Sequence, residues 1–363
     1  MKKNIFLVFS SFLISIVIIE LILNILGKYE NLVNTELEAS DSIYERPFSS
    51  FQKYKHPDLN YIIINYFDDD GVKNFTNTKT SQKKNIIGFF GDSFTENIAI
   101  DRQFEYSNVI NNHLKNYQVV NYGVGGYSAD QVFLRYLKYR DHDFKHIFYL
   151  FMPADTGFAT DIIFNNDGTY FLNKKEISHF YQILGKLNIT YFFLDVFYIS
   201  KYFLSKNYTK MNIENYNDVL ANKIYRKFYS MKFDTCIKNK AFCDSNFLKL
   251  LKVFKKEVES NNSKFYVLLY PNNKHIKHFK EIIKNDAENF NYFILNKDLE
   301  YDYINKKKNE YHFKNDDHWN EYGNILFAQN LSDIFEKLGI KSKRINKVNI
   351  FKEIDLFYNQ NKF

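Results

Sequence analysis

The sequence has little glycine, proline or cysteine, the residues that are typical of fibrous, disordered or zinc-stabilised proteins. Of its 363 residues only 12 are glycine and 4 are proline, which excludes a collagen-like or low-complexity chain. Its two cysteines, Cys236 and Cys243, lie in no Cys/His cluster with the spacing of a structural zinc site. In an oxidising compartment they could form a disulfide across a short loop; two free core thiols are the alternative.

Arginine is scarce as well. The formal net charge is +7, but only six of the 49 basic residues are arginine. Phosphate and base recognition favours the arginine fork, and no dense basic cluster occurs, so the sequence argues against a nucleic-acid partner. With 45% apolar residues, the chain can form one large domain or two small ones with a sizeable core.

One long hydrophobic run is present, at residues 5–26. It is long enough to span a bilayer, and Lys2 and Lys3 before it favour a cytoplasmic N-terminus. No small-x-small cleavage site follows, which favours an uncleaved anchor over a removed signal peptide. Glu20, near the far end, could snorkel or pair with a partner helix. We therefore expect residues 1–30 to form a single-pass membrane anchor, with the remainder on the extracytoplasmic (periplasmic) side.

From residue 85 onward, apolar strands alternate with amphipathic helices. Strands are expected at residues 85–90, 117–122, 146–152, 264–270 and 292–295, and helices at 105–115, 129–140, 247–259 and 321–338. This alternation predicts a parallel α/β sheet, whose ligands bind at the carboxyl ends of the strands. Ser93, Gly126 and Asp155 each follow such an end.

We place this α/β domain at residues 85–340. One further segment interrupts it, and two others lie before and after it. They are an extended lead-in at 31–84, an aromatic-rich insertion at 157–245 and a peripheral tail at 341–363. Within the insertion, residues 165–168 read Asn-Asn-Asp-Gly and predict a hairpin turn. The apolar stretch 176–206 is either a helical cap on the core or a lid that faces substrate or membrane.

The tripeptide Gly91-Asp92-Ser93 stands where the first strand passes into a helix. Thr95 and Glu96 suit a first helical turn. Such a turn can hold a serine at the top of the sheet among free backbone N–H groups, as a nucleophile requires. The alternative is that Ser93 only caps the helix and Gly91 only makes the turn.

A serine nucleophile needs a base, and the base needs an orienting group. Among the nine histidines, His318 is preceded by Asp316 and Asp317 in a loop just before a helix. An aspartate two residues before a histidine can bring its carboxylate to the imidazole Nδ1; otherwise these are solvated charges and a helix cap. The N–H groups of Ser93 and Gly126 could hold an oxyanion, although Gly126 alone is also typical of a plain glycine-rich turn.

In this order along the chain, the features resemble the SGNH or GDSL hydrolase family, whose fold is a flavodoxin-like three-layer α/β/α with a parallel sheet. The resemblance covers about residues 85–155 and 264–338. Its matching blocks are Gly91-Asp92-Ser93 with the nucleophile, residues 121–127 with the oxyanion-hole glycine Gly126, and residues 316–320, of the variant form Asp-x-His-Trp, with acid Asp316 and base His318. Residues 68–71 also resemble the turn before the core in anchored members. No metal or organic cofactor is implied.

Two positions depart from the family pattern. Ala154 stands where the third block usually supplies an asparagine that donates to the oxyanion. Loss of one such donor costs on the order of 100- to 1000-fold in rate, unless Thr156 or a backbone N–H replaces it. The commoner spacing would place the acid at Asn315, so we assign the acid to Asp316, with Asp317 pointing away.

Resemblance and anchor together predict a serine esterase that acts outside the cytoplasm on ester-linked acyl groups, above all O-acetyl groups, of cell-envelope glycans or lipids. The first alternative is an O-acyltransferase that decorates an exopolysaccharide, for which Glu20 could contact a membrane acyl-donor protein. The second is a non-catalytic glycan-binding protein on a decayed hydrolase fold, which Ala154 would favour.

Overall fold

The computed structural model describes residues 11, 14–22, 25, 51–67, 72–73, 85–152, 162–165, 169–172, 240–300 and 310–361. The chain divides into two compact units, one of residues 1–47 with 174–232 and one of residues 48–173 with 233–363. The second unit contains the sheet and all the candidate site residues that are described.

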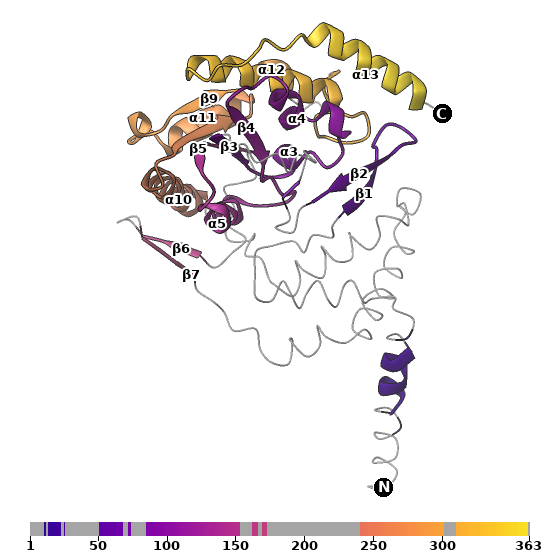
Figure 1. Ribbon diagram of the computed structural model, residues 1–363. Coiled ribbons are helices and arrows are strands. Elements are labelled where there is room, and N and C mark those ends of the chain that lie inside the picture. The colour runs from indigo at the N-terminus through magenta and orange to yellow at the C-terminus, as the bar shows by residue number, and fades with distance from the viewer. Residues whose placement is uncertain are drawn as a thin grey trace, which may run out of the picture. The chain divides into compact units, whose positions relative to one another are not determined.

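A five-stranded parallel sheet forms the centre of the second unit (Figure 1). Its strands are β3 (Asn85–Phe90), β4 (Tyr117–Asn121), β5 (Phe144–Phe151), β8 (Lys264–Leu269) and β9 (Tyr292–Ile294). They lie in the order β4-β3-β5-β8-β9, and each neighbouring pair is parallel. Counted along the chain, this is the 2-1-3-4-5 order of flavodoxin-like folds. The predicted parallel α/β sheet is confirmed.

Helices cover both faces of the sheet (Figure 1). On one side lie α4 (Tyr106–Asn111) and α12 (Glu321–Lys337); on the other lie α5 (Ala129–Tyr139), α10 (Lys240–Ser260) and α11 (Asn273–Ile282). Ile87 and Phe89 of β3 join the buried cluster on the α12 side, and Phe90 joins the cluster on the α5 side. Because side chains of a strand alternate between faces, a strand that is apolar throughout is buried on both, as this one is.

The lead-in contributes a two-stranded antiparallel sheet, β1 (Phe51–Lys55) and β2 (Ile62–Tyr66). Ile63 and Asn65 are buried, whereas Ile62, Ile64 and Tyr66 on the opposite face are exposed. The described part of the lead-in therefore packs on the α/β core through one face of a hairpin. Residues 68–71, expected to form a turn, lie outside the described residues.

We expected a peripheral tail at residues 341–363, but part of this segment is packed against the core. It carries α13 (Lys347–Asn361), which packs on α12 and buries Ile354 and Phe357 in the core. The spacing of three residues between these two side chains places them on one side of a helix. Lysine and asparagine around them obscure this narrow apolar stripe in the sequence.

The insertion contains a short hairpin of β6 (Ile162–Phe164) and β7 (Tyr170–Leu172), and its last residues, from Lys240 on, form the start of α10. The two strands pair antiparallel, and the Asn165 N–H donates to the Thr169 carbonyl at 2.8 Å, as expected for strands that flank a hairpin turn; residues 166–168 of the predicted turn lie outside the described residues. Residues 176–206 lie outside the described residues.

Cys243 lies in α10, is buried and is disulfide-bonded. Cys236, the only other cysteine in the sequence, lies outside the described residues. Of the two states that the sequence left open for Cys243, this is the disulfide.

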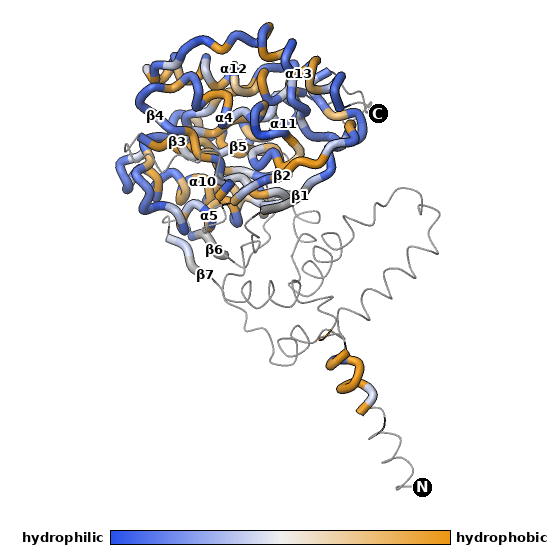
Figure 2. Tube along the Cα trace, turned by 45° about the vertical axis from the view of Figure 1, so that its right-hand side comes forward, coloured by the Kyte–Doolittle hydropathy of each residue, from blue (hydrophilic) through white to orange (hydrophobic). Residues whose placement is uncertain are grey.

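Residues 14–22 of the first unit are helical and mostly apolar (Figure 2), and their apolar side chains are largely exposed. Ile14, Val17, Leu21 and Ile22 each expose more than half of their surface. Most of the rest of the predicted anchor, which spans residues 1–30, lies outside the described residues. Among the stretches that are described, no helix is long and apolar enough to cross a membrane.

Candidate active site

Ser93 lies at the carboxyl end of β3, as the first residue of the short helix α3 (Ser93–Glu96). Asp92 caps this helix, because its carboxylate accepts the N–H of Phe94 at 3.0 Å. The Ser93 N–H belongs to the first turn, where helical N–H groups have no helical acceptor. Within the described part of the chain, no hydrogen bond uses it. The turn therefore presents a hydroxyl and an available N–H at the edge of the sheet.

His318 connects this hydroxyl to a carboxylate. Its Nε2 lies 2.6 Å from Ser93 Oγ, although the two residues are 225 positions apart. Its Nδ1 hydrogen-bonds to Asp316 Oδ1, which also accepts the His318 N–H at 2.9 Å. The structure thus brings the predicted nucleophile, base and acid into one chain of hydrogen bonds, with the geometry of a Ser-His-Asp triad.

Gly126 lies in the turn after β4, in the neighbouring position of the sheet. Its φ of 80° is in the left-handed region that favours glycine. The preceding Gly125 N–H donates to the Glu96 carboxylate at 2.5 Å, which ties this turn to α3. Gly123 permits the close approach, since a Cβ there would lie 2.4 Å from the backbone nitrogen of Glu96. Gly126 is exposed, and no hydrogen bond within the described residues uses its N–H, as an oxyanion donor requires.

The sequence matches no protein-family model and no curated protein. Among solved structures, a member of the lipolytic protein G-D-S-L family from Veillonella parvula DSM 2008 is 12% identical, with a TM-score of 0.35, and the match covers 70% of this chain and 98% of that one. A protein assigned to the lipolytic G-D-S-L family from Desulfitobacterium hafniense DCB-2 is 10% identical, with a TM-score of 0.34, and the match covers 69% and 99%.

The strand order and the chain order of the three motifs decide the fold type. This is an SGNH/GDSL hydrolase-like fold. In it, Ser93 follows the first strand of the sheet, Gly126 follows the second, and the Asp-x-His pair directly precedes the last helix against the sheet, α12. At 10–12% identity and with these TM-scores, the two solved structures add nothing about the chemistry of this site, which rests on its own geometry.

Within this site, electrostatics favour the protonated form of the base, His318. Burial lowers the pKa of His318, but the hydrogen bond and charge of Asp316, together with two further carboxylates, outweigh it, so that the pKa is raised above the ordinary 6.5. The charges of Asp92 and Asp317 act in the same direction. An imidazolium formed when Ser93 loses its proton would therefore be stabilised.

The pKa of the neighbouring Asp92 is raised as well, but by burial. Burial raises its pKa to about 6, although the Phe94 N–H and the neighbouring His318 oppose the shift, and Glu96 adds to it. Asp92 therefore changes charge close to the working range of His318. In the sequence, Asp92 stands out only as the middle residue of Gly91-Asp92-Ser93.

Aromatic packing fixes the plane of the imidazole. The Phe94 ring lies 4.7 Å from the His318 ring, between centroids, and 5.2 Å from that of Trp319. Trp319 is fully buried, and its Nε1 donates to the Leu299 carbonyl at 3.0 Å. The Phe313 N–H donates to the His318 carbonyl at 3.1 Å. This bond closes residues 313–318, which we call the base loop, into a narrow hairpin. His318 therefore approaches Ser93 from a well-packed loop.

A buried ion pair between Lys73 and Glu105 packs beside α3. Lys73 Nζ lies 2.7 Å from Glu105 Oε2, and both side chains are almost wholly buried. Lys73 also donates to the Asn97 carbonyl at 2.9 Å, and Asn121 Nδ2 donates to Glu105 Oε1 at 2.9 Å and to the Thr95 carbonyl at 2.6 Å. Side chains thus satisfy the carbonyls at the end of the nucleophile turn. Sequence reasoning missed Lys73, a single lysine in an irregular segment without periodicity.

The predicted departures of the third block cannot be placed, because Ala154 and Thr156 lie outside the described residues, as does Asp155. The role of a third oxyanion donor therefore stays a prediction.

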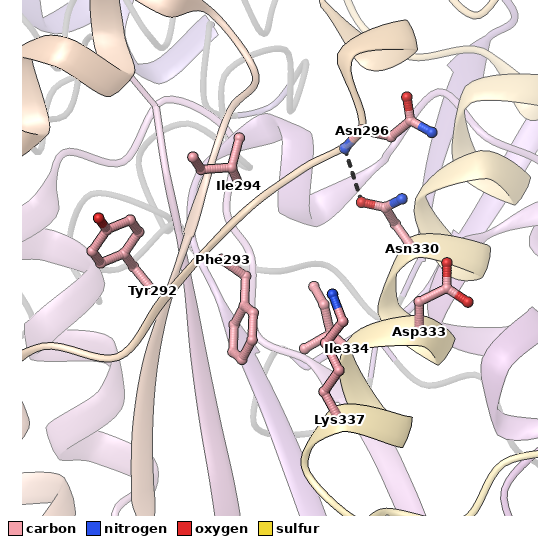
Figure 3. A pocket seen from close by; sticks show the side chains of 8 residues that line it. All are labelled: Tyr292, Phe293, Ile294, Asn296, Asn330, Asp333, Ile334 and Lys337. Atoms are coloured by element: carbon pink, nitrogen blue, oxygen red, sulfur yellow. Dashed lines mark hydrogen bonds between the residues drawn. The ribbon is translucent and has the colours of Figure 1, made fainter.

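A surface pocket of about 360 Å³ lies between β9 and α12 (Figure 3). It is lined by Tyr292, Phe293, Ile294, Asn296, Asn330, Asp333, Ile334 and Lys337. Asn330 Oδ1 accepts the Asn296 N–H at 2.9 Å and thereby joins its two walls. Neither Ser93 nor His318 lines this pocket, so it plays no part in the argument for catalysis.

Proposed function

We propose that the protein is a serine esterase that acts outside the cytoplasm on ester-linked acyl groups, above all O-acetyl groups, of cell-envelope glycans or lipids. The observation that carries this proposal is the hydrogen-bonded chain from Asp316 through His318 to Ser93. A helix-capping serine and a solvated Asp-x-His loop would have no reason to meet with Ser93 Oγ 2.6 Å from Nε2.

In the proposed reaction, Ser93 Oγ attacks the acyl carbon while its proton passes to His318 Nε2. Asp316 accepts the hydrogen bond of Nδ1 and stabilises the imidazolium. The N–H groups of Ser93 and Gly126 donate to the oxyanion of the tetrahedral intermediate. The C–O bond of the ester then breaks, and the leaving alcohol takes the proton from Nε2. Water, deprotonated by His318, attacks the acyl-enzyme and releases the carboxylic acid and free Ser93.

Two features support action outside the cytoplasm. The exposed apolar side chains of residues 14–22 suit a lipid environment, consistent with an anchor at residues 1–30. The disulfide at Cys243 suits an oxidising compartment. We therefore propose that the α/β domain works on the periplasmic side, where acylated glycans and lipids of the envelope would be its substrates.

A fluorophosphonate probe tests the nucleophile. We expect the full-length protein in detergent to be labelled at Ser93, as located by peptide mass spectrometry, and Ser93→Ala to be unlabelled. Asn60→Ala, at an exposed position, serves as a matched control and should label like wild type. A folded wild-type protein that stays unlabelled, under conditions that label a control esterase, would contradict the proposal.

Hydrolysis and transfer share the acyl-enzyme and differ only in whether water or a sugar hydroxyl resolves it. Incubation with an acetylated donor ester and an unacetylated oligosaccharide separates them. Free acetate is expected for the esterase, whereas acetylated oligosaccharide would indicate the transferase.

A further inference from the structure

The lead-in forms a tight turn at residues 56–59 beside the base loop. The buried His56 directs it, since its Nδ1 accepts the N–H groups of Asp58 and Leu59, both at 3.1 Å. The His56 N–H donates to the Tyr61 carbonyl at 2.8 Å. Because Nδ1 accepts two N–H groups, the ring proton lies on Nε2. The histidine is thus a rigid template that orients Asp58.

Asp58 grips the backbone immediately before the proposed acid. Its Oδ2 accepts the Lys314 N–H at 2.8 Å, and its Oδ1 accepts the Asn315 N–H at 3.0 Å. The Asn315 side chain returns two further bonds, to Asp58 Oδ1 and to the Pro57 carbonyl, each at 3.2 Å. A carboxylate that holds two consecutive N–H groups sets the direction of the chain at the next residue, which is Asp316.

The other end of the turn holds the far side of the base loop. His56 Nε2 lies 3.1 Å from Glu321 Oε1, and both side chains are fully buried. Glu321 is the first residue of α12, three positions after His318, and its Oε2 accepts the Tyr358 hydroxyl of α13 at 2.7 Å. The loop that carries Asp316 and His318 is therefore bracketed by two contacts from one turn.

We infer that Asp58 is a positioning residue, which holds the Asp316 carboxylate against Nδ1 of His318 through the backbone at residues 314–315. Its catalytic consequence rests on the proposed serine esterase activity, whereas its effect on His318 does not. The lead-in, expected to wrap the domain, thereby completes the acid–base half of the site.

Asp101 offers a matched control. Its carboxylate also joins the lead-in to the α/β body, since Oδ2 accepts the Tyr61 hydroxyl at 2.8 Å and Oδ1 accepts the Gln103 N–H at 3.2 Å. It has the same chemistry and a similar number of bonds, but none of them reaches the base loop. A general loosening of the lead-in should therefore be equal in Asp58→Ala and Asp101→Ala.

The test is a titration of His318 by NMR in the full-length protein with labelled histidine, with His318→Ala used for assignment. Asp316, Asp92, Asp317 and the Ser93 hydroxyl face this ring, and all four are unchanged in the variants compared. We expect Asp58→Ala to lower the pKa of His318 toward its ordinary 6.5, and Asp101→Ala to leave it unchanged.

Ester hydrolysis gives the second readout. We expect Asp58→Ala to lower kcat by about 10- to 100-fold, with KM changed less than about threefold, because a small displacement of the pair slows proton transfer more than binding. Asp58→Asn keeps one acceptor oxygen and should show the same changes at smaller size; it decides the question if Asp58→Ala does not fold. An unchanged His318 titration in the folded variant, or equal changes in Asp101→Ala, would overturn the inference. Because the titration needs no turnover, it separates this failure from a failure of the esterase proposal, which unlabelled wild-type protein would reveal.

Discussion

The two halves of the site are held together by different kinds of contact. The serine half is organised within a short stretch: Asp92 caps the helix two residues on, and Glu96 reaches Gly125 across 29 positions. The base half depends on partners that are 256 to 265 positions away, through Asp58 and His56. Both halves meet at the hydrogen bond between His318 and Ser93, beside which Phe94 packs on His318 and Trp319.

This difference teaches where the site is vulnerable. Closing a short loop orders few residues, so a local motif can set the nucleophile turn with few supporting contacts. The base loop has little regular structure of its own and takes its shape from the lead-in. Substitutions of Asp58 or His56 should therefore affect the acid and base first, whereas Lys73 is the lead-in residue that supports the nucleophile turn.

The largest effect tests whether the halves act as one unit. We expect Ser93→Ala and His318→Ala each to lower kcat for ester hydrolysis by at least about 10⁴-fold, and the double variant to lower it no further. Each removes the same proton transfer, so the second loss has nothing left to remove. Steady-state kinetics, with circular dichroism to verify folding, measures this. Multiplying effects would show that the halves contribute independently.

A middle-sized effect sharpens the description of the serine half. Glu96→Ala removes the acceptor of the Gly125 N–H and frees the turn that carries Gly126. We expect kcat to fall by about 10- to 100-fold, below the cost of deleting an oxyanion donor outright. Glu96→Gln keeps an acceptor oxygen and should stay within about fivefold of wild type. Equal losses in the two variants would mean that the charge of Glu96, rather than its hydrogen bond, matters.

The smallest effect connects the halves through charge. Because the base must be neutral to accept a proton, kcat/KM should rise with pH through the pKa of His318, which is raised above 6.5. The carboxylate of Asp92 contributes to that rise, so Asp92→Asn should move the acid limb of the pH–rate profile to lower pH by less than about one unit.

The same shift has a consequence for stability. A raised histidine pKa stabilises the folded state below the unfolded value of 6.5, and this contribution is lost as pH rises through the folded value. Thermal unfolding of wild type and His318→Gln at several pH values measures this contribution to stability separately from catalysis.

In the pH–rate experiment, an acid limb that does not move in Asp92→Asn would show that the two halves are electrostatically independent.

Much of the fold could be predicted because its strands are buried on both faces. Ile87, Phe89 and Phe90 form a continuous apolar run that no amphipathic helix would produce. The pairing of β6 with β7 could likewise be predicted, from the turn residues that separate them in the sequence. α13 could not be recognised, since its two buried residues stand among charged and polar ones.

The supporting residues of the site left no such signal. Asp58, His56 and Lys73 are single polar residues in an irregular lead-in, and their roles arise from partners far along the chain. Periodicity reports on a face that many residues share, whereas a buried ion pair or a clamp on two N–H groups needs only one side chain.

The sequence by itself determined the strands, the serine at the end of the first one, and an aspartate two residues before a histidine. These are local properties of chain direction and spacing. Only the tertiary structure decided that His318 reaches Ser93 across 225 positions and that the lead-in braces the loop behind it. The physical reason is that parallel strands bring their carboxyl ends to one edge of the sheet, where loops without structure of their own take their shape from whatever packs beside them.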